Sequence, residues 1–255
     1  MSDINNIAFL IPITSHNCYW NSINDSYLVN NLLKSIVNTC SNNKLTFYLG
    51  IDSDEKIYTK ENIKTVFNSI KKNSKSDSEF NCDICFDITT YVGIKKGYLT
   101  KMWNILYEKA YKTGLHNYYY QCGDDIYFKD KGWLTLSIDK LKSMNDIGIA
   151  GPKTLRKHKK RYKNEHIMTQ VLISNLHYKL FGKLFPEELI NWYCDDWLNF
   201  IYKDRTGKLN THGCVNYSLS NNNRYKFSKN DKSKFLKLAE KDIKIVLNYI
   251  ENSVC

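Results

Sequence analysis

Strand-like and helix-like segments alternate along the first 150 residues, and this alternation limits the possible folds more than any other feature of the sequence. Continuous apolar runs predict buried strands, and segments whose apolar residues recur at helical spacing predict helices. The predicted strands are 7–13, 44–51, 82–88, 118–122, 147–150 and 167–173, and the predicted helices are 28–37, 61–71, 98–111, 134–142 and 197–202. Parallel strands need crossover connections, whose helices cover both faces of a sheet. We therefore expect an α/β fold with a mostly parallel, doubly wound (Rossmann-like) sheet flanked by helices.

The length and composition narrow the class of protein. A chain of 255 residues without a linker rich in Pro, Gly or Ser is long enough for one large domain. The N-terminus is polar and no apolar run approaches membrane-spanning length, so we expect an intracellular protein, cytoplasmic or nuclear, without a signal peptide or membrane partner. The formal charge of +11 favours an anionic partner. Neither a Gly-x-Gly-x-x-Gly after the first strand nor a Gly-Lys-Ser/Thr motif occurs, which argues against dinucleotide oxidoreductases and P-loop enzymes.

Two adjacent acids follow the strand predicted at 118–122. Gly123 permits a sharp exit from this strand, and Asp124 and Asp125 come directly after it. Side chains alternate along an extended segment, so one carboxylate would ligate a hard cation while the other orients a water, a ribose or a base. Asp and Gly are also ordinary turn residues, and a turn without chemistry is the alternative.

Polar residues also follow the first two predicted strands. Thr14 comes after the first strand, and Asp52 and Asp54 come after the second. Ligands of doubly wound sheets bind outside the carboxyl ends of the strands. We therefore expect these residues to meet Asp124 and Asp125 at one edge of the sheet and to line a ligand site there.

A second acidic pair, Asp195 and Asp196, lies at the head of the helix predicted at 197–202. Acids are favoured at helix N-termini by capping and by the helix dipole, and Asp195 suits the cap. The neighbouring Trp192 and Trp197 would withdraw a carboxylate from water and raise its pKa toward that of a useful general base. The pair is thus either a structural cap or an acid–base group.

The order of elements resembles the nucleotide-sugar-dependent glycosyltransferases of the GT-A fold, whose metal-binding Asp-x-Asp motif ends the fourth strand of such a sheet. Short motifs between residues 169 and 225, among them Phe185-Pro186 and Cys194-Asp195-Asp196-Trp197, are similar to a narrower group. This is the glycosyltransferase group associated with TET/J-binding proteins, which includes the base-J glucosyltransferases and the C-terminal domain of the estrogen-regulated growth-regulation proteins. Gly123 stands in place of the first Asp of the usual metal motif. The resemblance implies one GT-A domain over residues 1–228, followed by a C-terminal helix over 229–255 that packs on it.

The resemblance also implies roles for individual residues. It assigns six residues to the donor: Thr14, Asp52, Asp54, Lys101, Asn104 and Asp124. Asp125 and His212 would bind Mn²⁺ or Mg²⁺. Asp196 would be the general base of an inverting transfer, with Asp195 beside it.

We therefore expect a metal-dependent glycosyltransferase that moves a sugar from a nucleotide sugar, a UDP-sugar by family resemblance, to an acceptor hydroxyl with inversion. Two alternatives are a catalytically inactive nucleic-acid or anion-binding module on the same fold, and a metal-dependent phosphohydrolase or nucleotidyltransferase. The acceptor is open between a hydroxylated DNA base, a protein hydroxyl and a glycan. The basic run at 153–163 would lie near the same edge, where it could close over a diphosphate or hold phosphates of the acceptor.

Overall fold

The computed structural model describes residues 5–41, 43–74, 82–155, 167–217 and 231–253. Its eight-stranded sheet has the order β3-β2-β1-β4-β7-β6-β8-β5. The strands are β1 (Asn5–Ile13), β2 (Asn43–Asp52), β3 (Asp83–Tyr91), β4 (Tyr118–Gln121), β5 (Ile126–Phe128), β6 (Ile149–Leu155), β7 (Val171–Ser174) and β8 (Thr206–Asn216). The α-helices are α1 (Lys34–Thr39), α2 (Lys60–Ser74), α3 (Leu99–Lys112), α4 (Trp133–Lys142), α5 (Asn175–Phe181), α6 (Cys194–Ile201) and α7 (Asp231–Ser253). A π-helical segment, Leu28–Leu33, runs directly into α1.

The first half of the sheet is parallel, as predicted. β3, β2, β1 and β4 lie side by side in the same direction, and the helices between them are the crossovers that parallel strands need. The second half is mixed: β7 runs antiparallel to both β4 and β6, β8 runs parallel to β6, and β5 runs antiparallel to β8. The prediction of a mostly parallel sheet therefore holds for the N-terminal half and not for the C-terminal half.

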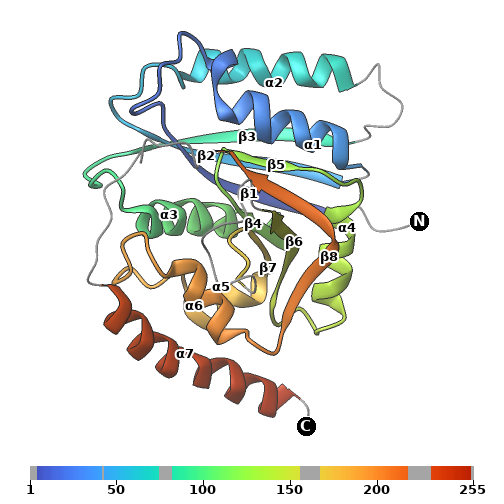
Figure 1. Ribbon diagram of the computed structural model, residues 1–255, viewed down its shortest axis with the longest axis vertical. Coiled ribbons are helices and arrows are strands. Elements are labelled where there is room, and N and C mark those ends of the chain that lie inside the picture. The colour runs from blue at the N-terminus through green and yellow to red at the C-terminus, as the bar shows by residue number, and fades with distance from the viewer. Residues whose placement is uncertain (1–4, 42, 75–81, 156–166, 218–230, 254–255) are drawn as a thin grey trace.

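The apolar run of β1 is buried on both faces of the sheet. Ile7, Phe9 and Ile11 pack into one core cluster with residues of α1, α2 and α4. Ala8 and Leu10 point to the opposite face, into a second cluster with residues of α3, α6 and α7. Figure 1 shows the two layers, with α1 and α2 on one side of the strands and α3, α6 and α7 on the other. The sequence of a strand that is covered on both sides is apolar at successive positions, because neither face contacts water.

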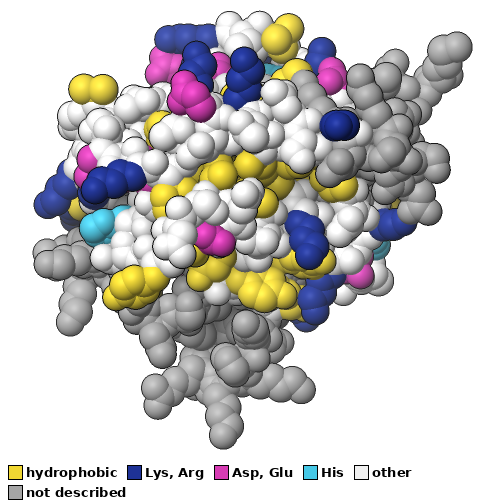
Figure 2. Space-filling model, turned by 90° about the horizontal axis from the view of Figure 1, so that it is seen from above, with side chains coloured by type: hydrophobic (Ala, Val, Ile, Leu, Met, Phe, Trp, Pro, Cys, Tyr) yellow, Lys and Arg dark blue, Asp and Glu magenta, His cyan; other side chains and the backbone are white. Residues whose placement is uncertain are grey.

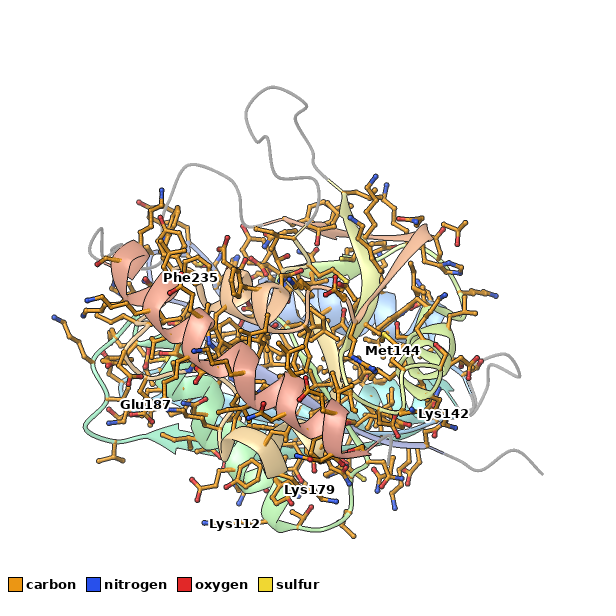
Figure 3. All side chains as sticks on the ribbon, turned by 90° about the horizontal axis from the view of Figure 1, so that it is seen from below. Lys112, Lys142, Met144, Lys179, Glu187 and Phe235 are labelled. Atoms are coloured by element: carbon orange, nitrogen blue, oxygen red, sulfur yellow. The ribbon has the colours of Figure 1, made fainter. Side chains whose placement is uncertain are left out.

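Aromatic contacts and a buried hydrogen bond fasten α7 to α6. The ring of Tyr193, the residue before α6, stacks on Phe235 of α7 with centroids 5.5 Å apart, and Figure 3 labels Phe235 near the start of α7. Farther along, the buried Trp197 indole donates from Nε1 to Asp242 at 3.1 Å. The C-terminal helix thus holds the helix that carries Asp195 and Asp196. Among the described residues, every helix is too short or too polar to cross a lipid bilayer.

A close approach near the end of β2 gives a test of the packing. Gly50 lies under the ring of Tyr91, whose hydroxyl donates to Met102 O at 3.2 Å on α3, and a Cβ on Gly50 would overlap the Tyr91 ring and hydroxyl. We expect Gly50→Ala to lower the free energy of unfolding by about 1–3 kcal/mol, as overpacking does in close-packed cores. Urea unfolding measures this. In a Tyr91→Ala background the same change should cost much less, and equal costs in the two backgrounds would contradict the contact.

Candidate active site at the carboxyl ends of the parallel strands

The carboxyl ends of β1, β2 and β4 lie next to one another. Ile13 pairs with Ile51, so Thr14 and Asp52 leave the sheet side by side. β4 pairs with β1 on its other side and ends at Gln121, three residues before Asp124. The structure therefore brings the first group of candidate residues to one edge, because adjacent parallel strands end together.

At the end of β1 and β2, polar groups are buried and paired. Thr14 is buried, and its hydroxyl accepts a hydrogen bond from the His16 amide at 3.2 Å. The Glu55 carboxylate accepts from the Ser15 amide at 2.9 Å and also from the Ser15 hydroxyl. Glu55 thus fixes the start of the loop that follows β1.

Asp52 and Asp54 have different surroundings. Burial, opposed by the charge of Lys96, raises the pKa of the Asp52 carboxyl. Asp54 is exposed and forms a 2.6 Å ion pair with Lys96, and this hydrogen bond lowers the pKa of its carboxyl. Lys96 lies in the loop after β3 and is a cation at the candidate site that sequence reasoning missed. A lysine following the third parallel strand was the available signal.

Asp124 and Asp125 are both buried at the end of β4, with 1% and 4% of their surface exposed. The Gly123 amide donates to Gln170 Oε1 at 3.0 Å, and a Cβ on Gly123 would lie 2.5 Å from Asp125 Oδ1. The Asp125 carboxylate therefore folds back over the position that a larger residue at 123 would occupy. Burial, followed by the charges of Asp125 and Asp124, raises the pKa of the Cys122 thiol.

His212 is not brought to Asp125. β5 pairs with β8 so that Ile126 lies opposite Asn216, and the Asp125 carbonyl accepts from the Tyr217 amide at 3.0 Å. His212 is four residues back along β8, roughly 13 Å in an extended strand. The donor atoms of two ligands of one ion lie within about 5 Å of each other, because each is within about 2.6 Å of the ion. The register of β5 and β8 therefore does not bring His212 to Asp125, and an ion shared by the two residues stays a prediction.

His212 lies near Thr211 and Asp130 rather than near the first acidic pair. Its Nδ1 lies 2.9 Å from the Thr211 hydroxyl, and the next residue, Gly213, donates from its amide to Asp130 at 2.7 Å. No group of three His, Cys, Asp or Glu residues that could hold a metal ion occurs within the described ranges. His212 was assigned to the site by resemblance. The sequence offered no check on this assignment, because neither β5 nor β8 was predicted and the register between them was unknown.

Two of the predicted donor-binding residues lie on α3. Lys101 is exposed, whereas the Asn104 side chain is hydrogen-bonded to the backbone of residues 184 and 185. The Asn104 amide donates to Phe185 O at 2.9 Å and accepts from the Leu184 and Phe185 amides at 3.1 and 2.9 Å. These bonds, with one from the Thr100 amide to Ile190 O at 3.2 Å, fix the segment 184–190 along the start of α3. Asn104 therefore positions the chain that leads to the second acidic pair.

The second acidic pair lies in the first turn of α6, which starts at Cys194, three residues earlier than predicted. Tyr193, at φ 65°, occupies the cap position, so the prediction that Asp195 caps the helix is wrong. Asp195 is instead the second helical residue, and its Oδ1 accepts from the Asp196 amide at 3.1 Å. Both carboxyls are half-buried, and Asp195 lies deeper.

The two carboxyls of this pair influence each other. Burial, followed by the charge of Asp196, raises the pKa of Asp195 to about 7, and burial also raises the pKa of Asp196. Two neighbouring carboxyls with raised pKa values titrate as a unit and can share one proton near neutral pH. The structure thus supports the acid–base interpretation of this pair, which we call the α6 dyad.

The raised pKa of Asp195 predicts an unusual pH dependence of stability. The folded protein binds this proton more tightly than the unfolded chain, whose Asp pKa is near 3.8, so the contribution of Asp195 to stability is greatest at low pH and falls as the pH rises from about 4 to 7. Asp195→Asn removes the ionisable group while keeping an acceptor for the Asp196 amide. We expect the free energy of unfolding of the variant, relative to that of wild type, to be higher at pH 8 than at pH 5 by on the order of 1 kcal/mol. Thermal unfolding at both pH values measures this gain.

Asp83→Asn is the control for this experiment, because Asp83 is exposed at the start of β3, at the opposite edge of the sheet. An Asp195→Asn gain that is the same at pH 5 and pH 8 would contradict the raised pKa.

The basic run is only partly described. Lys153 lies on β6 and is half-buried, and the remainder of the run lies outside the described residues. On the face shown in Figure 2, hydrophobic side chains gather across the middle, and described Lys and Arg side chains lie mostly toward the edges, singly or in small groups. The described part of this face therefore carries no continuous basic patch.

Comparisons with known proteins show which solved structures share the fold of this chain. No protein-family model matches the chain, and neither does any curated protein. Among solved structures, S. aureus TarS 1-349 in complex with UDP has a TM-score of 0.55, and the same protein in complex with UDP-GlcNAc has a TM-score of 0.58. Both are 11% identical to this chain and cover 93% of it, and the chain spans 65% and 66% of theirs. A structure of TarS of which the chain spans 39% has a TM-score of 0.56.

These likenesses confirm the predicted fold class. The narrower resemblance to the TET/J-binding-protein-associated group stays a prediction. The chain has a single α/β domain with a mixed sheet flanked by helices, and its fold matches the GT-A-like fold of TarS.

Proposed function

We propose that this protein transfers a sugar from a UDP-sugar to an acceptor hydroxyl with inversion at the anomeric carbon. The observation that carries the proposal is the presence of two acidic pairs of different character on one GT-A-like fold. Asp124 and Asp125 end a parallel strand at the edge where such sheets bind ligands, and the α6 dyad has the raised pKa of an acid–base group.

The donor would bind at the ends of β1, β2 and β4. TarS, which shares the fold, is described in complex with UDP and UDP-GlcNAc, which supports a UDP-sugar as the donor class. Thr14 and Asp52 offer buried polar groups for a base or a ribose, and the exposed Lys96 and Lys101 are cations that can approach phosphates. Asp54 would contact the donor beside its exposed ion pair with Lys96.

Asp124 and Asp125 fit a divalent cation. Mg²⁺ is commonly held by one or two carboxylates together with the phosphates of a substrate, and Mn²⁺ also favours oxygen ligands, so no histidine is required. Such an ion would offset the negative charge that develops on the leaving diphosphate. Asp125 would hold it with Asp124 beside it, and Gln170, through its bond to the Gly123 amide, would fix the backbone that carries them.

Asp196 would accept the proton of the acceptor hydroxyl. The acceptor oxygen forms a bond to the anomeric carbon while the bond from that carbon to the diphosphate breaks, and the hydroxyl proton goes to the carboxylate. Burial raises the pKa of the Asp196 carboxyl, opposed by its hydrogen bond with Asp195, while the charge of Asp196 raises the pKa of Asp195. Asp196 is the shallower of the two and is therefore the better placed to meet an acceptor that arrives from solvent.

A panel of nucleotide sugars tests the proposal. The protein is incubated with each donor and Mn²⁺, nucleotide release is followed, and the anomeric configuration of any product is read by NMR. We expect UDP release from at least one UDP-sugar and an inverted product. Binding of UDP without release would favour the inactive module, and cleavage of nucleic acid or of phosphate esters would favour the phosphohydrolase or nucleotidyltransferase alternative.

A further inference from the structure

One short segment of chain, residues 168–170, is hydrogen-bonded to Gly123, beside the first acidic pair, and to Asn199 on α6, which carries the second. It leads into β7, whose first residue Val171 lies opposite Gln121 at the end of β4. On one side the segment meets the turn that carries Asp124 and Asp125, and on the other it meets α6. The two pairs are about 70 residues apart in sequence, so their relative position depends on contacts of this kind.

Asn199 makes the bonds on the α6 side. Its Oδ1 accepts from the Met168 amide at 3.0 Å, and its Nδ2 donates to Met168 O and to Asp195 O, both at 2.8 Å. One carboxamide thus pairs with both backbone groups of Met168, as a neighbouring strand would, and also with the carbonyl of the dyad residue one turn earlier. Met168 is itself buried, so this end of the segment has little freedom.

Gln170 makes the bond on the β4 side. It is buried, and its Oε1 accepts from the Gly123 amide at 3.0 Å. The residue between, Thr169, is fixed to β6 through its hydroxyl, which lies 3.1 Å from that of Thr154. The continuous path is therefore Asp195, Asn199, residues 168–170 and Gly123, and every noncovalent link in it is a hydrogen bond of ordinary length.

We infer that Asn199 and Gln170 are positioning residues that hold the α6 dyad at a fixed place relative to Asp124 and Asp125. The inference deepens the proposed function and, for its effect on turnover, rests on it. In a direct displacement the base and the leaving-group site must act on one sugar from opposite sides. A displacement of about 1 Å between such groups costs on the order of 100-fold in rate.

The test combines kinetics with amide hydrogen exchange. We expect Asn199→Ala to lower kcat by about 10- to 100-fold while the KM for the donor changes by less than about threefold, because the donor residues at the ends of β1 and β2 lie outside this path. We also expect the Gly123 amide, which Asn199 does not touch, to exchange about tenfold faster in this variant. In the reverse direction, Gln170→Met should speed exchange of the Met168 amide by a similar factor.

Asn6→Ala is the matched control. Asn6 lies on β1 at the opposite edge of the sheet, and its carboxamide also makes two contacts, donating to Leu115 O at 2.7 Å and lying 3.0 Å from His116 Nδ1. We expect this variant to lose thermal stability with kcat and Gly123 exchange unchanged. Asn199→Asp, which keeps the acceptor for the Met168 amide, should protect that amide better than Asn199→Ala.

The outcomes separate the two proposals. Unchanged Gly123 exchange in a folded Asn199→Ala protein, or unchanged Met168 exchange in Gln170→Met, would overturn the positioning role whatever the activity. If wild-type protein releases no nucleotide from any donor, the proposed function fails, and the exchange data still decide whether the two acidic pairs are mechanically linked. If Asn199→Ala does not fold, the Gln170→Met result alone decides.

Discussion

Asp196→Asn should lower the rate of sugar transfer by on the order of 100-fold or more, the scale that general-base loss produces. The carboxamide matches the carboxylate in size and cannot accept the hydroxyl proton. Donor affinity should stay within a few-fold of wild type, because Asp196 lies on α6 and the donor residues lie at the ends of β1, β2 and β4. Steady-state transfer rates and UDP affinity, measured on the same preparations, check both statements.

The pH profile adds a second readout to this prediction. A base acts only when ionised, so wild-type kcat should rise with pH as Asp196, whose pKa burial raises above its ordinary value, loses its proton, and should then level off. Asp196→Asn should lose this ascending limb. Near-normal turnover of Asp196→Asn, or a product that keeps the anomeric configuration of the donor, would assign the base to Asp195 or the reaction to a retaining mechanism.

Asp125→Ala should abolish the stabilisation that UDP and a divalent cation together give to the protein. A ligand that binds only the folded state stabilises it by about 2.7 kcal/mol when its free concentration is 100 times its Kd. Because an ion held by Asp124 and Asp125 would join the diphosphate to the protein, we expect UDP to raise the Tm of wild type in Mn²⁺ or Mg²⁺ and to raise it little in EDTA. Thermal unfolding in the four combinations of UDP and metal measures the effect.

Two variants sharpen this experiment. Asp83→Ala removes an exposed acid from the opposite edge of the sheet and should leave the UDP effect intact. His212→Ala should also leave it intact, since the register of β8 places His212 beside Asp130 rather than Asp125. Equal stabilisation by UDP in EDTA would show that the carboxylates bind the donor without an ion. Loss of the effect in His212→Ala would show that β8 moves when the donor binds.

The parallel half of the fold was predictable because its signals are local. The run in β1 is apolar on every residue since both of its faces are covered, and the same pattern located β2 and β4. Once the strands are known to be parallel, their polar ends must meet, which is why Thr14, Asp52 and Asp124 were placed at one edge. The start of α6 was predicted three residues late because the acidic pair was assigned to the cap rather than to the first turn.

The C-terminal half was harder because its strands are short or irregular. β5 has three residues, and β8 is interrupted by a register shift opposite Pro152 and Lys153, so neither gives a clear alternating pattern. Without these two strands, His212 could be assigned only by resemblance. Lys96 and Asn104 likewise have ordinary sequence contexts. The ion pair with Asp54 shows the role of Lys96, and the hydrogen bonds from the amides of residues 184 and 185 show that of Asn104.

The sequence by itself determined the α/β class, the parallel strands and the two acidic pairs, because burial and side-chain periodicity act over a few residues and leave a direct trace in the chain. The tertiary structure decided how the pairs are set relative to each other and which residues serve them. The register of β8 places His212 away from Asp125, and Asn104 is hydrogen-bonded to a neighbouring loop. Hydrogen bonds of Asn199 and Gln170 connect the two acidic pairs through residues 168–170. Such contacts join segments tens of residues apart, and their partners are fixed only when the chain has packed.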